Sequence, residues 1–196
     1  GRIVLNAPIS KTAGGDADLT FISDGKINIQ SSIESTSGKL NVTAKARNHV
    51  QFLKSEGGNQ QGRATGMSIK TNGGDIVFWS NSGNETSAST NNDIYIGDGA
   101  TFESAGGKII LAGGEDTNTD DYPDGYAYIG GDYAEYSGPV GGRADDSDLE
   151  PPAISLGSLN RMDGDLITFK STGGDIILRG HSGRNDVDGS SAIQTQ

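Results

Sequence analysis

A glycine doublet followed by a short apolar run recurs along this chain and limits the folds that it can adopt. The copies read T-N-G-G-D-I-V-F, S-A-G-G-K-I-I-L and S-T-G-G-D-I-I-L, and degenerate copies occupy residues 23–29 and 36–42. The second glycines, Gly74, Gly107 and Gly174, are 33 and 67 residues apart, so the second interval is close to twice the first. Self-similarity at a regular interval is typical of repeat architectures.

Two further series run in phase with the doublets. D-I-Y-I-G from Asp93 is matched by Y-A-Y-I-G from Tyr126 and A-I-S-L-G from Ala153, and T-F-E-S from Thr101 is matched by T-F-K-S from Thr168. Apolar residues alternate with polar ones in these runs, and Gly, Asn, Asp and Ser bound them, which favours strands joined by turns. No three-turn helical stripe is found, and the one helical candidate, residues 44–54, fits a strand equally well.

Many short strands at nearly fixed spacing describe either a β-sandwich or a β-solenoid. The solenoid is favoured because like segments recur in register and no tight hairpin joins runs of matched length. Ile, Leu, Val and Phe make up about a fifth of the 196 residues and the net charge is −11, a composition near the disordered class. Coils of about 20 to 25 residues, each burying only inward side chains, resolve that conflict with a thin but fully used core.

The opening segment resembles the filamentous-haemagglutinin-type exoproteins of two-partner secretion. The resemblance rests on I-V-L-N-A-P-I-S-K-T-A-G-G-D-A-D-L-T-F and S-G-K-L-N-V-T-A, and it covers residues 1–114 and 153–183. It implies a right-handed parallel β-helix (β-solenoid) with loop excursions, secreted through an outer-membrane transporter and displayed on the surface of a Gram-negative bacterium. The N-P-N motifs of the family's secretion domain are absent, so the chain resembles the rod beyond it. We therefore expect residues 1–196 to be one β-helix segment of a longer protein.

The charge balance and residue usage exclude several function classes. A net charge of −11 argues against nucleic acid and anionic membrane as partners, since both require a basic surface. The chain has no Cys and two His, which leaves little material for thiolate chemistry or a zinc site. No apolar run approaches the roughly 18 residues of a membrane span, so no membrane insertion is expected.

The loops that follow the G-G-x-I strands are the predicted binding surface. They occupy residues 80–92, 113–125 and 180–189, and insertions at one repeat position emerge on one face of a solenoid. The largest departure from the repeat is an acidic, tyrosine-rich excursion at 115–152, which holds five of the six tyrosines. Tyr rings stack on sugars and Asp carboxylates accept sugar hydroxyls, so glycan or surface-protein binding is predicted here. The alternatives are solvated corners, or a segment that folds back and covers the rod. The predicted contacts are Tyr122, Tyr126, Tyr133, Tyr136, Asp121 and Asp124.

Oxygen-bearing side chains at alternate positions in D-T-N-T-D-D favour a loop that wraps a hard cation. The predicted calcium ligands are Asp116, Asn118 and Asp120. The string lacks the glycine and glutamate of a complete calcium loop, so an ordinary acidic loop is the alternative.

The resulting functional hypothesis is a structural and adhesive rod segment, not an enzyme, that serves cell adhesion and biofilm formation. The alternative is a carbohydrate-active β-helix enzyme, either a polysaccharide lyase or a glycosidase. Such an enzyme needs paired carboxylates, or a bound cation with a nearby base. The basic residues of this chain are dispersed, and no repeat groups them with carboxylates, which favours the binding role.

Overall fold

The computed structural model describes residues 1–54, 64–84, 91–129, 154–156, 166–182 and 193–195. Within these ranges the chain forms β-strands joined by turns and loops and contains no helix, so the predicted all-β class is confirmed. Residues 44–54 follow the strand alternative, since β6 ends at Ala46 and β7 begins at Val50.

Most strands belong to three parallel sheets, here called A, B and C. Sheet A contains β1 (Arg2–Leu5), β4 (Lys26–Ile29), β7 (Val50–Phe52), β11 (Ile94–Ile96), β15 (Ile154–Leu156) and β19 (Ile193–Thr195). Sheet B contains β2 (Ile9–Lys11), β5 (Ile33–Ser35), β8 (Ser68–Lys70), β12 (Thr101–Glu103) and β16 (Thr168–Lys170). Sheet C contains β3 (Ala17–Ser23), β6 (Leu40–Ala46), β9 (Ile76–Ser80), β13 (Ile109–Gly113) and β17 (Ile176–Leu178).

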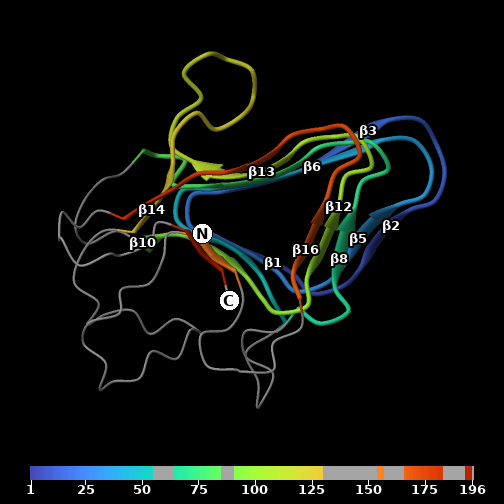
Figure 1. The fold of residues 1–196 in the computed structure, drawn as a ribbon, viewed down its shortest axis with the longest axis horizontal. Coiled ribbons are helices and arrows are strands. Elements are labelled where there is room, and N and C mark those ends of the chain that lie inside the picture. Colours follow the sequence, from blue (N-terminus) through green and yellow to red (C-terminus); the bar gives the residue numbers. More distant parts are fainter. Residues whose placement is uncertain (55–63, 85–90, 130–153, 157–165, 183–192, 196) are drawn as a thin grey trace.

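Successive strands visit sheets A, B and C in turn and then return to sheet A, and each such pass is called a coil. Coil 1 is therefore β1, β2 and β3, and coil 2 is β4, β5 and β6. Figure 1 shows the three sheets arranged around one interior. Parallel pairing between coils combined with this cyclic order is consistent with a β-solenoid.

The repeats recognised in the sequence lie beside one another in the structure. Ile109 pairs with Ile76 on one side and with Ile176 on the other, and Phe102 pairs with Phe169. Ile76 and Ile109 are fully buried, whereas Ile176 lies on the last strand of sheet C and is 43% exposed. The predicted register is thus confirmed, while burial of the inward column is complete only where a coil lies on each side.

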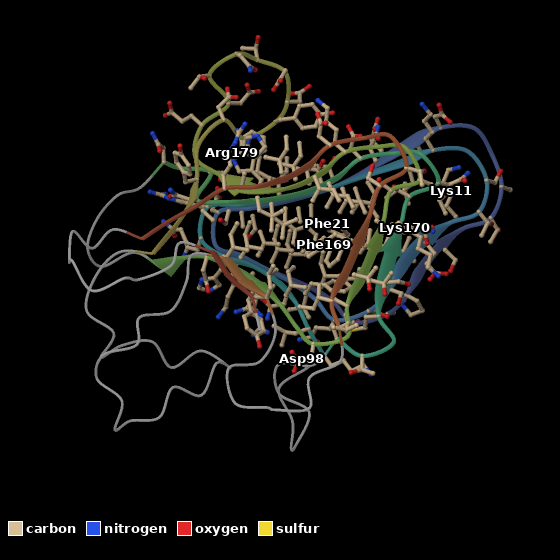
Figure 2. All side chains as sticks on the ribbon, in the orientation of Figure 1. Lys11, Phe21, Asp98, Phe169, Lys170 and Arg179 are labelled. Atoms are coloured by element: carbon tan, nitrogen blue, oxygen red, sulfur yellow. The ribbon has the colours of Figure 1, made fainter. Side chains whose placement is uncertain are left out.

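The interior is a single cluster of apolar side chains that runs through all five coils. Inward residues of neighbouring strands stack directly, as where the Phe102 ring lies 5.1 Å from the Phe52 ring and 5.2 Å from the Phe169 ring. Figure 2 shows Phe169 in this interior, together with Phe21 of coil 1. A low apolar content suffices because nearly every inward position carries an apolar side chain.

Two details of the repeat alignment differ from the sequence prediction. Residues 126–129 do not join sheet A with the D-I-Y-I-G segment. They form β14 (Ala127–Ile129) of a small fourth sheet, antiparallel to β10 (Asn91–Asn92) and parallel to β18 (Gly180–Ser182). Gly125 already bridges back to Gly113 at the end of β13, so the chain has not yet advanced to the next coil.

Coil length is the second difference. Ile27 lies beside Val50, in agreement with the expected 20 to 25 residues, but Val50 lies beside Ile94 and Ile94 beside Ile154. Long loops inserted between strands lengthen the later coils without changing the strand register. The chain therefore forms fewer coils than its length suggests.

Candidate binding surface

The loops that follow β9, β13 and β17 leave the same edge of sheet C, because parallel strands end on the same side. Ser80 at the end of β9 pairs with Gly113 at the end of β13, and Gly114 donates its N–H to the Asn81 carbonyl at 3.2 Å. The described parts of the first two loops thus begin side by side, as the sequence predicted. Residues 85–90 and 183–192 lie outside the described residues.

The loop after β13 folds back onto the outer face of sheet C, and Tyr122 is its anchor. The Tyr122 ring packs on a small outward-facing apolar cluster that contains Val77, Trp79 and Ile110. The tyrosine hydroxyl donates a hydrogen bond to Asp75 Oδ2, and Lys108 Nζ lies 4.4 Å from the ring centre. Burial, followed by the hydrogen bond to Asp75, raises the pKa of Tyr122 to about 12.

Trp79 holds the start of the same loop. Its indole Nε1 donates to the Gly114 carbonyl at 2.7 Å, and Lys45 Nζ lies 3.5 Å above the ring. Arg179, which follows β17, donates from a guanidinium nitrogen to the Pro123 carbonyl at 3.0 Å. Figure 2 shows Arg179 at the base of the loop. Strands of three coils therefore fix the loop, which makes it a rigid projection from the scaffold.

The alternating acidic residues of the loop accept hydrogen bonds from the loop's own backbone. Asp116 Oδ1 accepts from Thr119 N at 2.7 Å, and its Oδ2 accepts from Asp121 N at 2.9 Å. Asn118 Oδ1 accepts from Asp120 N at 3.0 Å, and Asp120 Oδ1 accepts from Tyr122 N at 3.1 Å. Such local bonds are the usual reason why Asp and Asn are favoured in turns.

Asp124 closes the loop in the same manner. Its Oδ2 accepts from the Thr117 hydroxyl at 2.7 Å and from Thr117 N at 2.8 Å. These bonds, that from the hydroxyl first, hold the pKa of the Asp124 carboxyl below its ordinary value. Asp124 therefore shapes the loop, and its carboxylate is already engaged on one side.

The residues predicted to bind calcium lie within one turn, but their oxygens point to backbone N–H groups. Among the described residues, no group of three or more His, Cys, Asp or Glu side chains is placed to share a metal ion. The hydrogen bonds of Asp116, Asn118 and Asp120 account for the alternate spacing without an ion. Calcium binding stays a prediction.

The side chains left available at this edge are Tyr126, which is 52% exposed, and the exposed carboxylates of Asp116, Asp120 and Asp121. Tyr122 differs from them, because its ring and hydroxyl are both in use. Tyr133 and Tyr136 lie outside the described residues, as does the rest of the excursion beyond Ile129. Of the predicted tyrosines that are described, one is an anchor and one is accessible.

Sequence reasoning missed the residues that hold the loop, which are Asp75, Trp79, Lys108 and Arg179. A signal for the first three was present, since they alternate with inward residues of the G-G-x-I strands and must therefore face outward. That signal fixes the face of the sheet on which they lie. It does not reveal that a loop from a later part of the chain covers them.

The statement that no repeat groups basic residues with carboxylates is wrong for sheet B. The outward positions of β5, β8, β12 and β16 carry Glu34, Lys70, Glu103 and Lys170, which lie in one column. Lys70 Nζ lies 3.2 Å from Glu34 Oε1, and Lys170 Nζ lies 2.7 Å from Glu103 Oε1. The column was missed because its members are 33 to 67 residues apart in the sequence, and only the strand register aligns them.

Comparison of the chain with protein-family models, with curated proteins and with solved structures gives no significant match. In the described ranges there is also no helix long and apolar enough to cross a membrane.

Proposed function

We propose that this chain is a segment of a right-handed parallel β-helix that acts as an adhesive rod in a secreted or surface-displayed bacterial exoprotein. Right-handedness is supported by the strong preference of crossovers between parallel strands of one sheet for that hand. The resemblance to filamentous-haemagglutinin-type exoproteins supports secretion from a Gram-negative bacterium through an outer-membrane transporter.

The observation that carries the adhesive role is the contrast between the loop edge and the rest of the surface. The outer face of sheet B is a regular column of Glu and Lys, whereas the loop at 114–126 is a single projection held by Trp79 and Tyr122. A rigid projection supports recognition because little conformational entropy is lost on binding. The proposed ligand is a glycan, or a protein on another cell surface, bound through Tyr126 and Asp121.

The direction of the exposed groups fits a sugar ligand better than an acidic one. A half-exposed Tyr offers a flat apolar face, and exposed carboxylate oxygens accept hydroxyl hydrogens. Net negative charge at the edge disfavours sulfated or phosphorylated partners. Neutral or amino-sugar glycans are therefore the proposed class.

The test is a glycan array with three forms of the folded protein. Wild type is expected to bind a restricted set of neutral or amino-sugar glycans, and Tyr126→Ala with Asp121→Asn is expected to lose that binding without a change in melting temperature. Lys70→Ala, on the outer face of sheet B, is the matched control and should bind as wild type does. Absence of binding by wild type to glycans and to host-cell surfaces would contradict the adhesive role. Release of reducing ends or unsaturated sugars from a polysaccharide would favour the enzyme alternative.

A further inference from the structure

Strand β3, at one end of sheet C, presents a free hydrogen-bonding edge. Ala17 N donates to the Lys39 carbonyl at 2.9 Å, and the Ser23 carbonyl accepts from Arg47 N at 2.9 Å, so the odd-numbered residues of β3 bond to β6. Backbone groups alternate in direction along a strand, so Asp18, Thr20 and Ile22 direct both N–H and C=O away from β6. In the part of the chain that the structure describes, β3 pairs on the β6 side alone.

The side chains of coil 1 are also less covered than those of the later coils. Leu19 and Phe21 are only partly buried, whereas their neighbours in coil 2, Val42 and Ala44, are fully buried. Ile22 is 68% exposed and Val4 is 42% exposed, and both belong to this coil. An uncovered strand edge beside exposed apolar side chains is a site where another strand adds.

We propose that this edge is a self-association surface, on which a second copy of the chain pairs its own β3 antiparallel to the first. The pairing is centred on Thr20, so that Thr20 faces Thr20 and Asp18 of one copy faces Ile22 of the other. All three residues whose backbone groups point outward then form hydrogen-bonded pairs, with two bonds in each pair. The inward residues Leu19 and Phe21 meet across the boundary and continue the apolar interior.

The arrangement of charges is what favours a second copy as the occupant. The only charged residue among the outward positions of β3 is Asp18, and antiparallel pairing about Thr20 places it opposite Ile22, so no like charges face each other. The resulting contact is isologous and closes after two copies.

Head-to-tail stacking of copies is disfavoured by two features of the other end. Sheet A has six strands while sheets B and C have five, so β19 already occupies the place that β1 of a following copy would take. Continued register in sheet C would also place Asp175 beside Asp18 of that copy, which is a like-charge contact.

Sedimentation velocity of the 196-residue chain across a concentration series tests this proposal. Wild type is expected to form a reversible dimer. Ile22→Asp should weaken it by about tenfold, because the introduced carboxylate would face Asp18 of the other copy in both symmetric positions, whereas Ile22→Lys should preserve or tighten it. Both changes remove the same exposed isoleucine, so loss of apolar area alone would affect them equally.

A backbone variant provides the second arm. Thr20→Pro removes an N–H that points to the free edge and that makes no bond to β6, so the variant should be monomeric with little change in melting temperature. Thr20→Ala is the matched control and should still dimerise. A wild-type chain that stays monomeric at millimolar concentration overturns the proposal. So do equal effects of the aspartate and lysine substitutions of Ile22, or a dimer that survives Thr20→Pro.

Discussion

The hydroxyl of Tyr122 donates a hydrogen bond to the carboxylate of Asp75, a residue 47 positions earlier in the sequence that lies immediately before β9. Asp75 also accepts the backbone N–H of Lys108 at 2.7 Å, so one carboxylate links coil 3, coil 4 and the loop between coils 4 and 5. Through this contact the acidic loop becomes part of the scaffold. It also separates the role of Tyr122, which is structural, from that of the accessible Tyr126.

Removing the Tyr122 ring should undock the loop. Tyr122→Ala uncovers Val77 and Ile110 and is expected to cost about 1–2 kcal/mol, less than a fully buried aromatic ring would, while Tyr122→Phe should cost about 1 kcal/mol. Trp79 is the only tryptophan of the chain, so its emission should shift to the red in Tyr122→Ala. Tyr126→Ala is the control and should leave both readouts unchanged. An unaltered emission spectrum in Tyr122→Ala would contradict the docking.

Alkaline titration should release the same loop. Because the fold raises the pKa of Tyr122 to about 12 from its ordinary value of 10, it favours the protonated hydroxyl. The associated stabilisation is complete below pH 10 and is lost as the pH rises through 12. Trp79 emission is expected to change over that interval in wild type, whereas Tyr122→Phe, which has no hydroxyl to ionise, should lack this transition.

The stacked glycines predict a strong effect of a single methyl group. A Cβ added at Gly107 would lie 2.1 Å from the Gly74 carbonyl oxygen, while Gly174 holds the same relation to Gly107. These contacts are with backbone atoms, so the coils would have to separate, and Gly107→Ala is expected to cost more than about 3 kcal/mol. At Gly15 nothing lies within 4 Å of an added Cβ, so Gly15→Ala is the matched control. Equal melting temperatures for the two variants would argue against close stacking of the coils.

The repeat and its strands could be predicted from the sequence, since the register depends on local patterns. Gly107, Ile109 and Phe102 carry the same residue types as their neighbours in adjacent coils, and like segments stack on one another. The assignment of residues 126–129 failed because Y-A-Y-I-G imitates D-I-Y-I-G, while the Gly113–Gly125 bridge that redirects it is a tertiary contact. Local similarity could not reveal that bridge.

The candidate site was predicted less completely for the same reason. The loop edge follows from the repeat, but the partners of Tyr122 come from β9 and β13 and depend on how the loop folds back. The aspartates were interpreted as ion ligands because the spacing that suits a cation also suits backbone capping. Only the direction of each carboxylate separates these two roles.

Acid should weaken the ladder on sheet B. The hydrogen bond from Lys170 holds the pKa of Glu103 below 4.5, and those from Ser68 and Lys70 do the same for Glu34. A lowered pKa means that the stabilisation is present above pH 4.5 and is lost as the pH falls further. Glu103→Gln should therefore cost under about 1 kcal/mol at pH 7 and nothing at about pH 3, as measured by urea denaturation. A cost that persists in acid would show that the ion pair is not its source.

Calcium is expected to raise the melting temperature if the loop at Asp116, Asn118 and Asp120 binds the ion. Asp120→Ala should then remove the increment, while Asp16→Ala, remote from the loop in coil 1, should retain it. Titration calorimetry measures binding directly. No heat at millimolar calcium would contradict the prediction and leave backbone capping as the role of these side chains.

Cross-linking between coils tests the in-register parallel stacking most directly. Thr101 and Thr168 lie side by side at outward positions of β12 and β16, and neighbouring strands are about 4.8 Å apart, within the Cα separation of a disulfide. Since the chain has no cysteine, Thr101→Cys with Thr168→Cys should oxidise to a single bridged species. Thr101→Cys with Thr172→Cys, displaced by four residues, should stay reduced under the same conditions. Efficient bridging of the displaced pair, or none in the aligned pair, would contradict the stacked-coil structure.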